Sequence, residues 1–206
     1  ELALDANGTF LAMRLLSRNN VGAFVTMIGF ISTNGISTAG CGNYVTPAYH
    51  GQGAAILTNT VPVSNYRAPG GAPGTYVLER IIDMAAADLG IDPAEIRRRN
   101  LIPAGAMPYR LANNTTYDSG EFEAVMDKCL SRADYAGAGA RKEDARARGR
   151  LLGVGVSTTV DPSAGPSPET AELRFDPGGT VVVLVGSTAG GQGHETIYTQ
   201  IVCDRL

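Results

Sequence analysis

A glycine-rich segment near the carboxyl end of the sequence has the residue types that hold anionic ligands. Residues 190–193 of the segment 186–197 read Gly-Gly-Gln-Gly, and His194 and Thr196 come soon after them. The β-branched run at 180–185 predicts a buried strand before the segment, and a helix is predicted from Thr196 onward. Unpaired amides at a helix start favour phosphate, and glycines let a ligand approach the main chain. The segment is a candidate anion cradle, and an ordinary strand-to-helix turn is the alternative interpretation.

A second glycine-rich turn, at residues 65–74, contains Arg67 between an aromatic residue and an Ala-Pro-Gly-Gly run. A helix is predicted directly after this turn, from Thr75. A guanidinium held in a stiff loop beside an aromatic ring is suited to binding an oxyanion. A surface arginine, or one that caps a helix, is the plainer interpretation of the same residues, and both stay open at this point.

Composition and charge exclude several classes of protein. The 206 residues are 44% hydrophobic and 18% charged, as in ordinary globular proteins, with a formal net charge of −3 and a pI near 5.4. Such a chain is not attracted to nucleic acid or to an anionic membrane, and no apolar stretch reaches the roughly 20 residues that cross a bilayer. The three cysteines show no Cys-x-x-Cys spacing, which argues against a disulfide framework and against a zinc or Fe–S site. We expect a cytoplasmic, reducing environment.

Two similar β-hairpins are predicted, one near each end of the chain. Residues 1–14 place two strand-like runs around an Asp-Ala-Asn-Gly turn, and residues 172–182 repeat the pattern around Asp-Pro-Gly-Gly. Such turns recur in unrelated proteins, so the likeness is interpreted as general turn chemistry. Residues 31–60 are rich in Gly, Ser, Thr and Asn and predict loop or irregular extended chain. The sequence opens in a strand-like run and closes in a helical one without a C-cap signal, so we expect an internal piece of a longer polypeptide.

Three helices are predicted between these hairpins. The first covers residues 75–89, the second runs from the N-cap Asp92 to about Asn100, and the third begins near Ser119. Their arginine run at 97–99 is interpreted as a solvated helix face. The predicted core stripes are Val77, Ile81, Met84, Ala85 and Leu89 in the first helix and Phe122, Val125, Met126, Cys129 and Leu130 in the third.

These elements predict an α+β fold in which helices pack on mixed or antiparallel sheets. Residues 136–150 are rich in Gly and Ala and then in charge, which is typical of a surface connection between domains. A second set of strands is predicted to begin at residues 151–156. We therefore expect two partial domains, at residues 1–145 and 146–206.

Four segments, in order along the chain, resemble the molybdenum hydroxylases, the family of xanthine dehydrogenase, aldehyde oxidase and the carbon monoxide dehydrogenase large subunit. Residues 66–71, Tyr-Arg-Ala-Pro-Gly-Gly, are similar to the family's aromatic-Arg-Gly-x-Gly-Gly loop. Residues 191–196, Gly-Gln-Gly-His-Glu-Thr, are similar to the loop that holds its pyranopterin cofactor, and 90–102 and 116–120 look like its bacterial members. The resemblance covers nearly all of the chain.

The resemblance implies parts of the two molybdopterin-binding domains of a catalytic subunit that hydroxylates an aldehyde or an N-heterocycle with oxygen from water. Molybdopterin with molybdenum, in the cytosine dinucleotide form, would carry the redox chemistry, and Fe–S and FAD subunits or domains would take the electrons. The other expected partners are the remainder of the large subunit and a small-molecule substrate. Arg67 would lie near the metal and stabilise negative charge during catalysis. The residues implied in cofactor binding are Ala68, Gly190, Gly191, Gln192, Gly193, His194, Glu195 and Thr196.

Departures from the family's pattern limit what the resemblance implies. Ala68 stands where the carbon monoxide dehydrogenase form has a copper-binding cysteine, so carbon monoxide oxidation is not expected. Residues 71–74, Gly-Ala-Pro-Gly, replace the Arg-Pro-Glu-Ala of bacterial relatives, which predicts another loop shape and substrate preference. The family's catalytic glutamate and its earlier cofactor loop lie outside these 206 residues, so the chain alone is not expected to turn over substrate.

Other ligand-binding motifs fail on their spacing. No Gly-Lys-Ser/Thr ends a phosphate loop, and Thr196 occupies the last glycine position of a dinucleotide fingerprint. Tyr198 stands where a zinc protease needs its second histidine. The alternative that stays open is a non-catalytic scaffold or assembly piece whose glycine-rich turns serve only packing. The amides of residues 190–196 distinguish the two, because a ligand site needs them to face open space.

Overall fold

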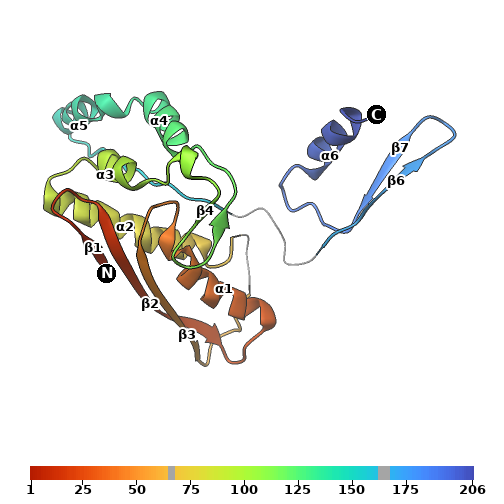
Figure 1. The fold of residues 1–206 in the computed structure, drawn as a ribbon, viewed down its shortest axis with the longest axis horizontal. Coiled ribbons are helices and arrows are strands. Elements are labelled where there is room, and N and C mark those ends of the chain that lie inside the picture. Colours follow the sequence, from red (N-terminus) through yellow and green to blue (C-terminus); the bar gives the residue numbers. More distant parts are fainter. Residues whose placement is uncertain (65–67, 162–167) are drawn as a thin grey trace. The chain divides into compact units, whose positions relative to one another are not determined.

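The computed structural model describes residues 1–64, 68–161 and 168–206 (Figure 1). By its internal contacts the chain divides into two compact units, Glu1–Asp161 and Pro162–Leu206. The predicted site residues lie in different units: Ala68 belongs to the first unit and the loop at 190–196 to the second.

The first unit is built on a three-stranded mixed sheet in the order β1-β2-β3. Its strands are β1 (Leu2–Leu4), β2 (Phe10–Gly22) and β3 (Ala48–Leu57). β1 and β2 are antiparallel, and the Asp5 carboxylate between them accepts hydrogen bonds from the Asn7 and Thr9 amides at 2.9 and 2.8 Å. The predicted first hairpin is confirmed.

The prediction of irregular chain at residues 31–60 is wrong, because much of this region belongs to α1 (Met27–Thr38) and to β3, which pairs in parallel with β2. The N-cap of α1 is Thr26, whose hydroxyl accepts a hydrogen bond from the Gly29 amide at 2.9 Å. The glycines here make room for close packing, since a Cβ at Gly35 would overlap the Pro69 carbonyl oxygen. Tight packing therefore gives this region a composition that is usual for loops.

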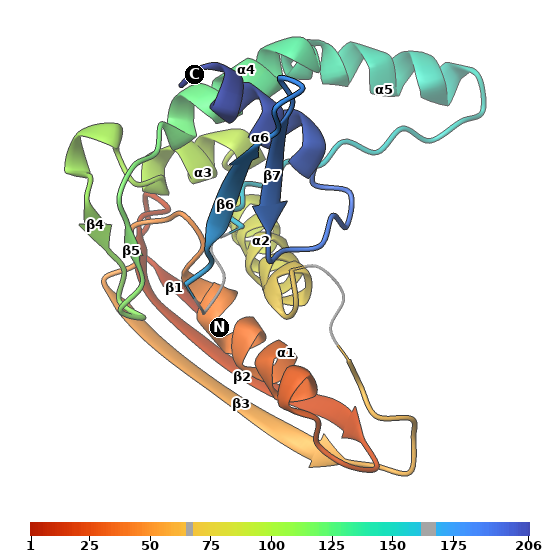
Figure 2. The same cartoon turned by 90° about the vertical axis from the view of Figure 1, so that its right-hand side faces the viewer.

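Helices α1 and α2 cover one face of the sheet, as Figure 2 shows. The helices after α1 in this unit are α2 (Gly71–Leu89), α3 (Pro93–Asn100), α4 (Phe122–Arg132) and α5 (Ala138–Ala147). The main core includes Phe10, Met13, Leu15, Tyr44, Leu78, Ile82 and Ile96. The three predicted helices are confirmed, but α2 buries Leu78 and Ile82 while Val77 and Met84 are exposed. Two adjacent stripes of this helix have the same apolar spacing, so periodicity could not choose between them.

The remaining elements of the first unit are short: η1 (Ala39–Cys41), η2 (Ala104–Ala106), β4 (Tyr109–Arg110), β5 (Thr116–Tyr117) and η3 (Tyr135–Gly137). β4 and β5 form a separate antiparallel pair. In the part of the chain that the structure describes, no helix combines the length and the apolar composition needed to cross a membrane.

Two further expectations for this region need correction. Cys129, predicted to lie in the core, is exposed, because α4 packs the stripe Phe122, Met126 and Leu130 inward. Residues 136–150 contain the helix α5, and their role as a connection between domains stays a prediction. Residues 151–161 lie in no strand, contrary to the prediction for 151–156. The division into domains at residues 145 and 146 stays a prediction.

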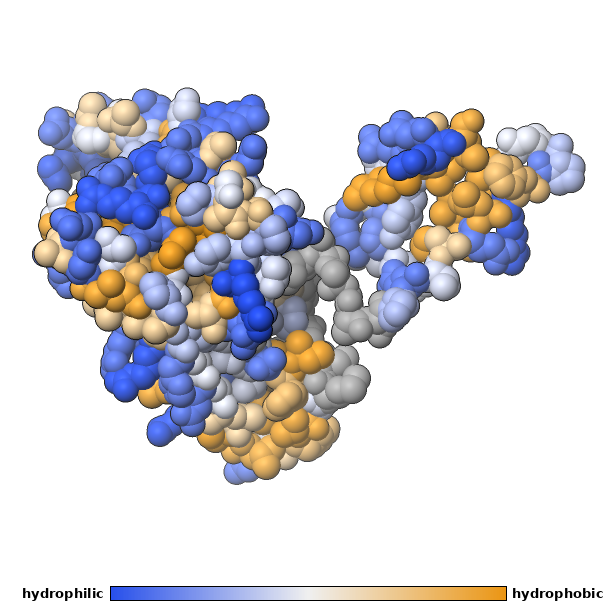
Figure 3. Space-filling model, in the orientation of Figure 1, coloured by the Kyte–Doolittle hydropathy of each residue, from blue (hydrophilic) through white to orange (hydrophobic). Residues whose placement is uncertain are grey.

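The second unit is a hairpin followed by a helix, made of β6 (Ala171–Phe175), β7 (Val181–Val185) and α6 (His194–Cys203). β6 and β7 are antiparallel, which confirms the second hairpin and, with the first unit, the predicted α+β class. Many of its apolar side chains are exposed, among them Phe175, Ile197 and Ile201. Figure 3 shows hydrophobic residues in orange on the surface of this unit. The strand predicted as buried at 180–185 is thus exposed or half-buried along its length.

The fold predicts a large effect for Asn100→Ala. The Asn100 side chain accepts a hydrogen bond from the Phe10 amide at 2.7 Å and donates to the Gly8 and Ile96 carbonyl oxygens at 2.8 Å, all in buried positions. Its loss leaves these groups without partners and should lower the stability of the unit by on the order of 3 kcal/mol. Hydrogen exchange of the slowest β2 amides measures this. The control variant Asn7→Ala, at an exposed position, should change the stability by less than about 0.5 kcal/mol. Equal effects of the two variants would show that the buried hydrogen bonds of Asn100 do not stabilise the unit.

Candidate functional site

The predicted anion cradle is an open loop between β7 and α6. Gly191 and Gly193 have φ angles of +101° and +77°, which other residues rarely adopt, so this backbone path favours glycine at both positions. Residues 190–193 are exposed, and a Cβ built at Gly193 would meet no atom within 4 Å. The loop is therefore shaped by its backbone conformation, and open space lies beside it.

One of the loop's amides is bonded within the loop, and others are not capped by side chains. The Gly190 amide donates to Oε1 of Gln192, whose Nε2 donates to the Thr188 carbonyl oxygen at 3.5 Å. α6 makes its first helical bond from the Ile197 amide, at 3.0 Å, and no side chain caps the helix start. The amides of residues 194–196 therefore keep the arrangement of a helix N-terminus, which attracts anions.

The side chains of the first turn of α6 differ in exposure. Glu195 and Thr196 are exposed, whereas Nδ1 of His194 is buried and has no hydrogen-bond partner among the described residues. The His194 ring packs on Tyr198 with centroids 5.0 Å apart, and the Tyr198 hydroxyl lies 3.2 Å from Ser187 Oγ. A buried polar atom is costly until it gains a partner, so His194 adds a hydrogen-bonding group at the base of the loop.

Ala68 lies in the first unit, beside a cavity of about 600 Å³. The cavity lies between the first turns of α2 and residues 155–161, and its lining includes Ala68, Thr75, Tyr76, Glu79, Val156 and Thr159. Ala68 has a φ angle of +57°, which is uncommon for a residue other than glycine. Arg67, the predicted catalytic residue, lies outside the described residues. Ala68 and the loop at 190–196 belong to different units, so a common site for them stays a prediction.

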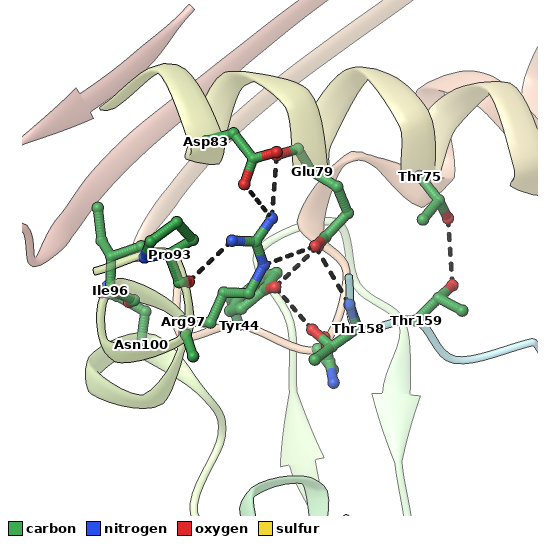
Figure 4. Close-up of polar contacts among 12 residues, drawn as sticks. Tyr44, Thr75, Glu79, Asp83, Pro93, Ile96, Arg97, Asn100, Thr158 and Thr159 are labelled. Atoms are coloured by element: carbon green, nitrogen blue, oxygen red, sulfur yellow. Dashed lines mark hydrogen bonds and ion pairs between the residues drawn. The ribbon is translucent and has the colours of Figure 1, made fainter. Parts of the chain in front are cut away.

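Sequence reasoning missed a buried charged network beside this cavity (Figure 4). Arg97 is completely buried, so the prediction of a solvated face at 97–99 is wrong for this residue. Its Nε donates to Glu79 Oε2 at 2.8 Å, Nη1 donates to the Pro93 carbonyl oxygen at 2.8 Å, and Nη2 lies 2.9 Å from Asp83 Oδ1. Burial alone would lower the pKa of Arg97, but the charge and hydrogen bond of Glu79, together with Tyr44 and Asp83, outweigh it and the pKa is raised.

Tyr44 and Thr158 extend the network to the segment 151–161. The Tyr44 hydroxyl donates to Glu79 Oε1 at 2.7 Å and lies 2.6 Å from Thr158 Oγ1. The Thr158 amide donates to Glu79 Oε2 at 3.1 Å, and its hydroxyl donates to Asn43 Oδ1 at 3.0 Å. Burial, followed by the negative charge of Glu79, raises the pKa of Tyr44, so this hydroxyl keeps its proton at neutral pH.

A sequence signal for this network exists in α2. Glu79 directly follows Leu78 on the stripe that the helix buries, and a carboxylate in such a position requires a buried partner. The partner is the first of three consecutive arginines, next to the fully buried Ile96. A buried cation is therefore required once the buried stripe of α2 is known, which periodicity did not give, and the choice among the arginines required the packing of α3 on α2.

Two family models, each described as a molybdopterin cofactor-binding domain, match residues 1–101 and 128–206. Together they include most of both units described above, with the loop at 186–196 inside the second match. The chain belongs to the molybdopterin cofactor-binding domain family.

Relatives of this molybdopterin-binding chain are molybdenum hydroxylase subunits. It is 34% identical to the 6-hydroxypseudooxynicotine dehydrogenase complex subunit gamma of Paenarthrobacter nicotinovorans, over 100% of this chain and 27% of that protein. It is 30% identical to the carbon monoxide dehydrogenase large chain of Hydrogenophaga pseudoflava, over 100% of this chain and 28% of that protein. The crystal structure of quinoline 2-oxidoreductase from Pseudomonas putida 86 matches 98% of this chain and 28% of its own, with a TM-score of 0.88 and 32% identity.

These likenesses confirm the resemblance to molybdenum hydroxylase large subunits. The molybdopterin-binding chain spans about a quarter of the length of its curated relatives, 27% and 28% in these two cases. Its glycine loop, its uncapped helix start and the unpartnered His194 nitrogen suit an anionic, hydrogen-bonding cofactor of the kind that the family binds.

The buried network predicts that Glu79→Ala destabilises the first unit by about 3–5 kcal/mol, because Arg97 then lacks its main counter-ion. The matched control is Glu123→Ala, which removes a carboxylate that is 60% exposed and 3.6 Å from Arg98 Nε, and should cost less than about 1 kcal/mol. Native-state hydrogen exchange of the α2 amides measures both variants. Comparable losses would show that Arg97 does not depend on Glu79.

Proposed function

We propose that this chain forms part of the cofactor-binding centre of a molybdenum hydroxylase acting on an aldehyde or an N-heterocycle. In this proposal the cofactor is molybdopterin cytosine dinucleotide with molybdenum, and Fe–S and FAD subunits or domains receive the electrons. The observation that supports it is the open, exposed loop at 190–193 leading to the uncapped start of α6. Main-chain donors in that arrangement bind the phosphate end of a nucleotide cofactor.

The residues of this chain would hold and orient the cofactor. The amides of residues 194–196 would donate to phosphate oxygens, and the glycines would let the cofactor approach the main chain. Gln192 presents both an amide donor and an acceptor, and it would exchange its bonds within the loop for bonds to the pterin. When bound, the molybdenum–pterin group supplies the redox chemistry of hydroxylation.

Arg67 would act on the substrate side of this centre. A guanidinium there would stabilise negative charge that develops on a carbonyl-type oxygen. Ala68 cannot ligate copper as a cysteine would, so carbon monoxide oxidation is not part of the proposal. The cavity beside Ala68 gives this side of the chain an available volume of about 600 Å³, within the range of small-molecule pockets.

The scaffold alternative assigns the glycines of the loop to packing only. Glycines that serve packing in this chain are crowded: a Cβ at Gly74 would lie 2.6 Å from the Ala39 Cβ. By contrast, a Cβ at Gly193 would meet nothing within 4 Å, and one at Gly190 would come no closer than 3.4 Å to Gln192 Oε1. Open glycines after a strand favour a ligand over a packing role.

The cofactor-loop proposal predicts the outcome of Gly193→Ala in the full-length polypeptide expressed with its partner subunits. The added methyl group would occupy the space where the cofactor approaches, and cofactor content should fall by about tenfold, equivalent to about 1.4 kcal/mol. Gly179→Ala is the matched control, because Gly179 has a φ of +87° and open surroundings in the hairpin turn of the same unit. Molybdenum and acid-released cytosine nucleotide are measured. Equal losses in the two variants would assign the effect to backbone strain and reject the proposal.

The catalytic proposal for Arg67 has a separate test. Arg67→Ala in the same full-length enzyme should lower kcat/KM by about two orders of magnitude or more, the usual effect of removing one group that stabilises an oxyanion. Molybdenum content should change little. Equal losses of turnover and of molybdenum would make Arg67 a structural residue.

A further inference from the structure

Residues 151–161, the last of the first unit, form an extended segment without strand partners. Exposure alternates along its second half, where Val156, Thr158 and Val160 are half-buried and their neighbours are exposed. The alternation shows that one side of the extended chain faces the unit. Because no ladder of main-chain bonds holds it, the position of this segment depends on a few side-chain contacts.

Thr158 attaches the inward-facing side of this segment to the rest of the unit. Its amide donates to Glu79 Oε2, and its hydroxyl lies within hydrogen-bond distance of Tyr44 and of Asn43. A second contact joins the hydroxyl groups of Thr159 and Thr75 at 3.1 Å, on the exposed side. Water replaces the exposed contact more readily than the bonds to Glu79 and Tyr44, whose side chains are buried.

The network that receives Thr158 is itself fixed. Glu79 is held by the completely buried Arg97 through Nε at 2.8 Å, and Nη2 of Arg97 also donates to the Glu79 carbonyl oxygen at 3.1 Å. The Tyr44 hydroxyl gives its single proton to Glu79, and the single proton of the Thr158 hydroxyl goes either to Tyr44 or to Asn43 Oδ1. An extended segment is thereby attached to a rigid, charged part of the core.

We propose that Thr158 is a positioning residue that fixes the 155–161 wall of the cavity beside Ala68 by fastening it to the Glu79–Arg97 ion pair. The opposite wall is the first part of α2, which also carries Glu79, so the same carboxylate sets the spacing of both walls. The positioning role goes beyond the proposed cofactor loop. The positioning role is tested mainly by hydrogen exchange of this chain's own amides, which can be measured with or without a bound cofactor.

The test uses the full-length polypeptide with its partner subunits and three variants. Thr158→Val removes the hydroxyl at nearly constant size, Thr158→Ser keeps it, and Thr159→Val removes the neighbouring exposed hydroxyl. Hydrogen exchange of a peptide covering 151–161 should be roughly tenfold faster in Thr158→Val, as expected for losing one net hydrogen bond. It should stay at the wild-type rate in Thr158→Ser and in Thr159→Val.

Kinetics provides a second readout of the same variants. A wall that is no longer fixed should raise KM for the substrate several-fold in Thr158→Val while kcat and molybdenum content are maintained, and Thr158→Ser should restore KM. Unchanged exchange in Thr158→Val, equal acceleration in Thr159→Val, or failure of serine to restore the rate would each overturn the positioning role. If the wild-type protein contained no molybdenum, the proposed function would be rejected. The hydrogen-exchange comparison of the Thr158 variants would still decide whether Thr158 has the positioning role.

Discussion

The buried ion pair between Arg97 and Glu79 is the constraint on which the first unit depends. Neither charge can be buried without partners, because removing a charge from water costs several kcal/mol. Arg97 is satisfied by the Glu79 carboxylate, by Asp83 and by two main-chain carbonyl oxygens, which lie on α2 and at the start of α3. The N–H donors of the Arg97 guanidinium lie in one plane and point in fixed directions. The ion pair therefore fixes the position of α3 relative to α2 as well as neutralising charge.

The same pair explains how a segment without strand partners can have a defined place. Glu79 uses its second oxygen for Tyr44, which comes from the chain between α1 and β3. Tyr44 packs edge-to-face on Phe10 of β2, with ring centroids 5.4 Å apart, and so joins the ion pair to the sheet. Polar groups of α2, α3, the segment before β3 and residues 151–161 therefore meet at one carboxylate. A network of this kind is stable only when every member has a partner.

The sequence predicted those elements whose signals are local. The first hairpin follows from the Asp-Ala-Asn-Gly turn, and α3 follows from Asp92, which caps the Ala94 and Glu95 amides at 2.8 and 3.1 Å. What it could not predict are features decided by neighbours distant in sequence. Gly35 and Gly74 were indistinguishable from loop glycines because the atoms that crowd them lie more than 30 residues away in the chain. Arg97 was hidden for the same reason, since burial of one arginine among three depends on the face that α3 turns toward α2.

For the candidate site, the sequence resemblance points to the loop at 190–196, and its ligand role stays a prediction that the open surroundings of Gly190 and Gly193 favour over a packing turn. The second unit consists of a two-stranded hairpin and one helix, and many of its apolar side chains are exposed. A two-stranded hairpin is marginally stable by itself, so the order of this unit must depend on surfaces that cover those side chains and on any ligand that binds its folded form. The first unit has the opposite character, because it encloses the Arg97–Glu79 ion pair in a packed core. Order in the first unit therefore comes from buried charge, whereas the glycine loop of the second unit would gain order from an anion that binds its main-chain donors.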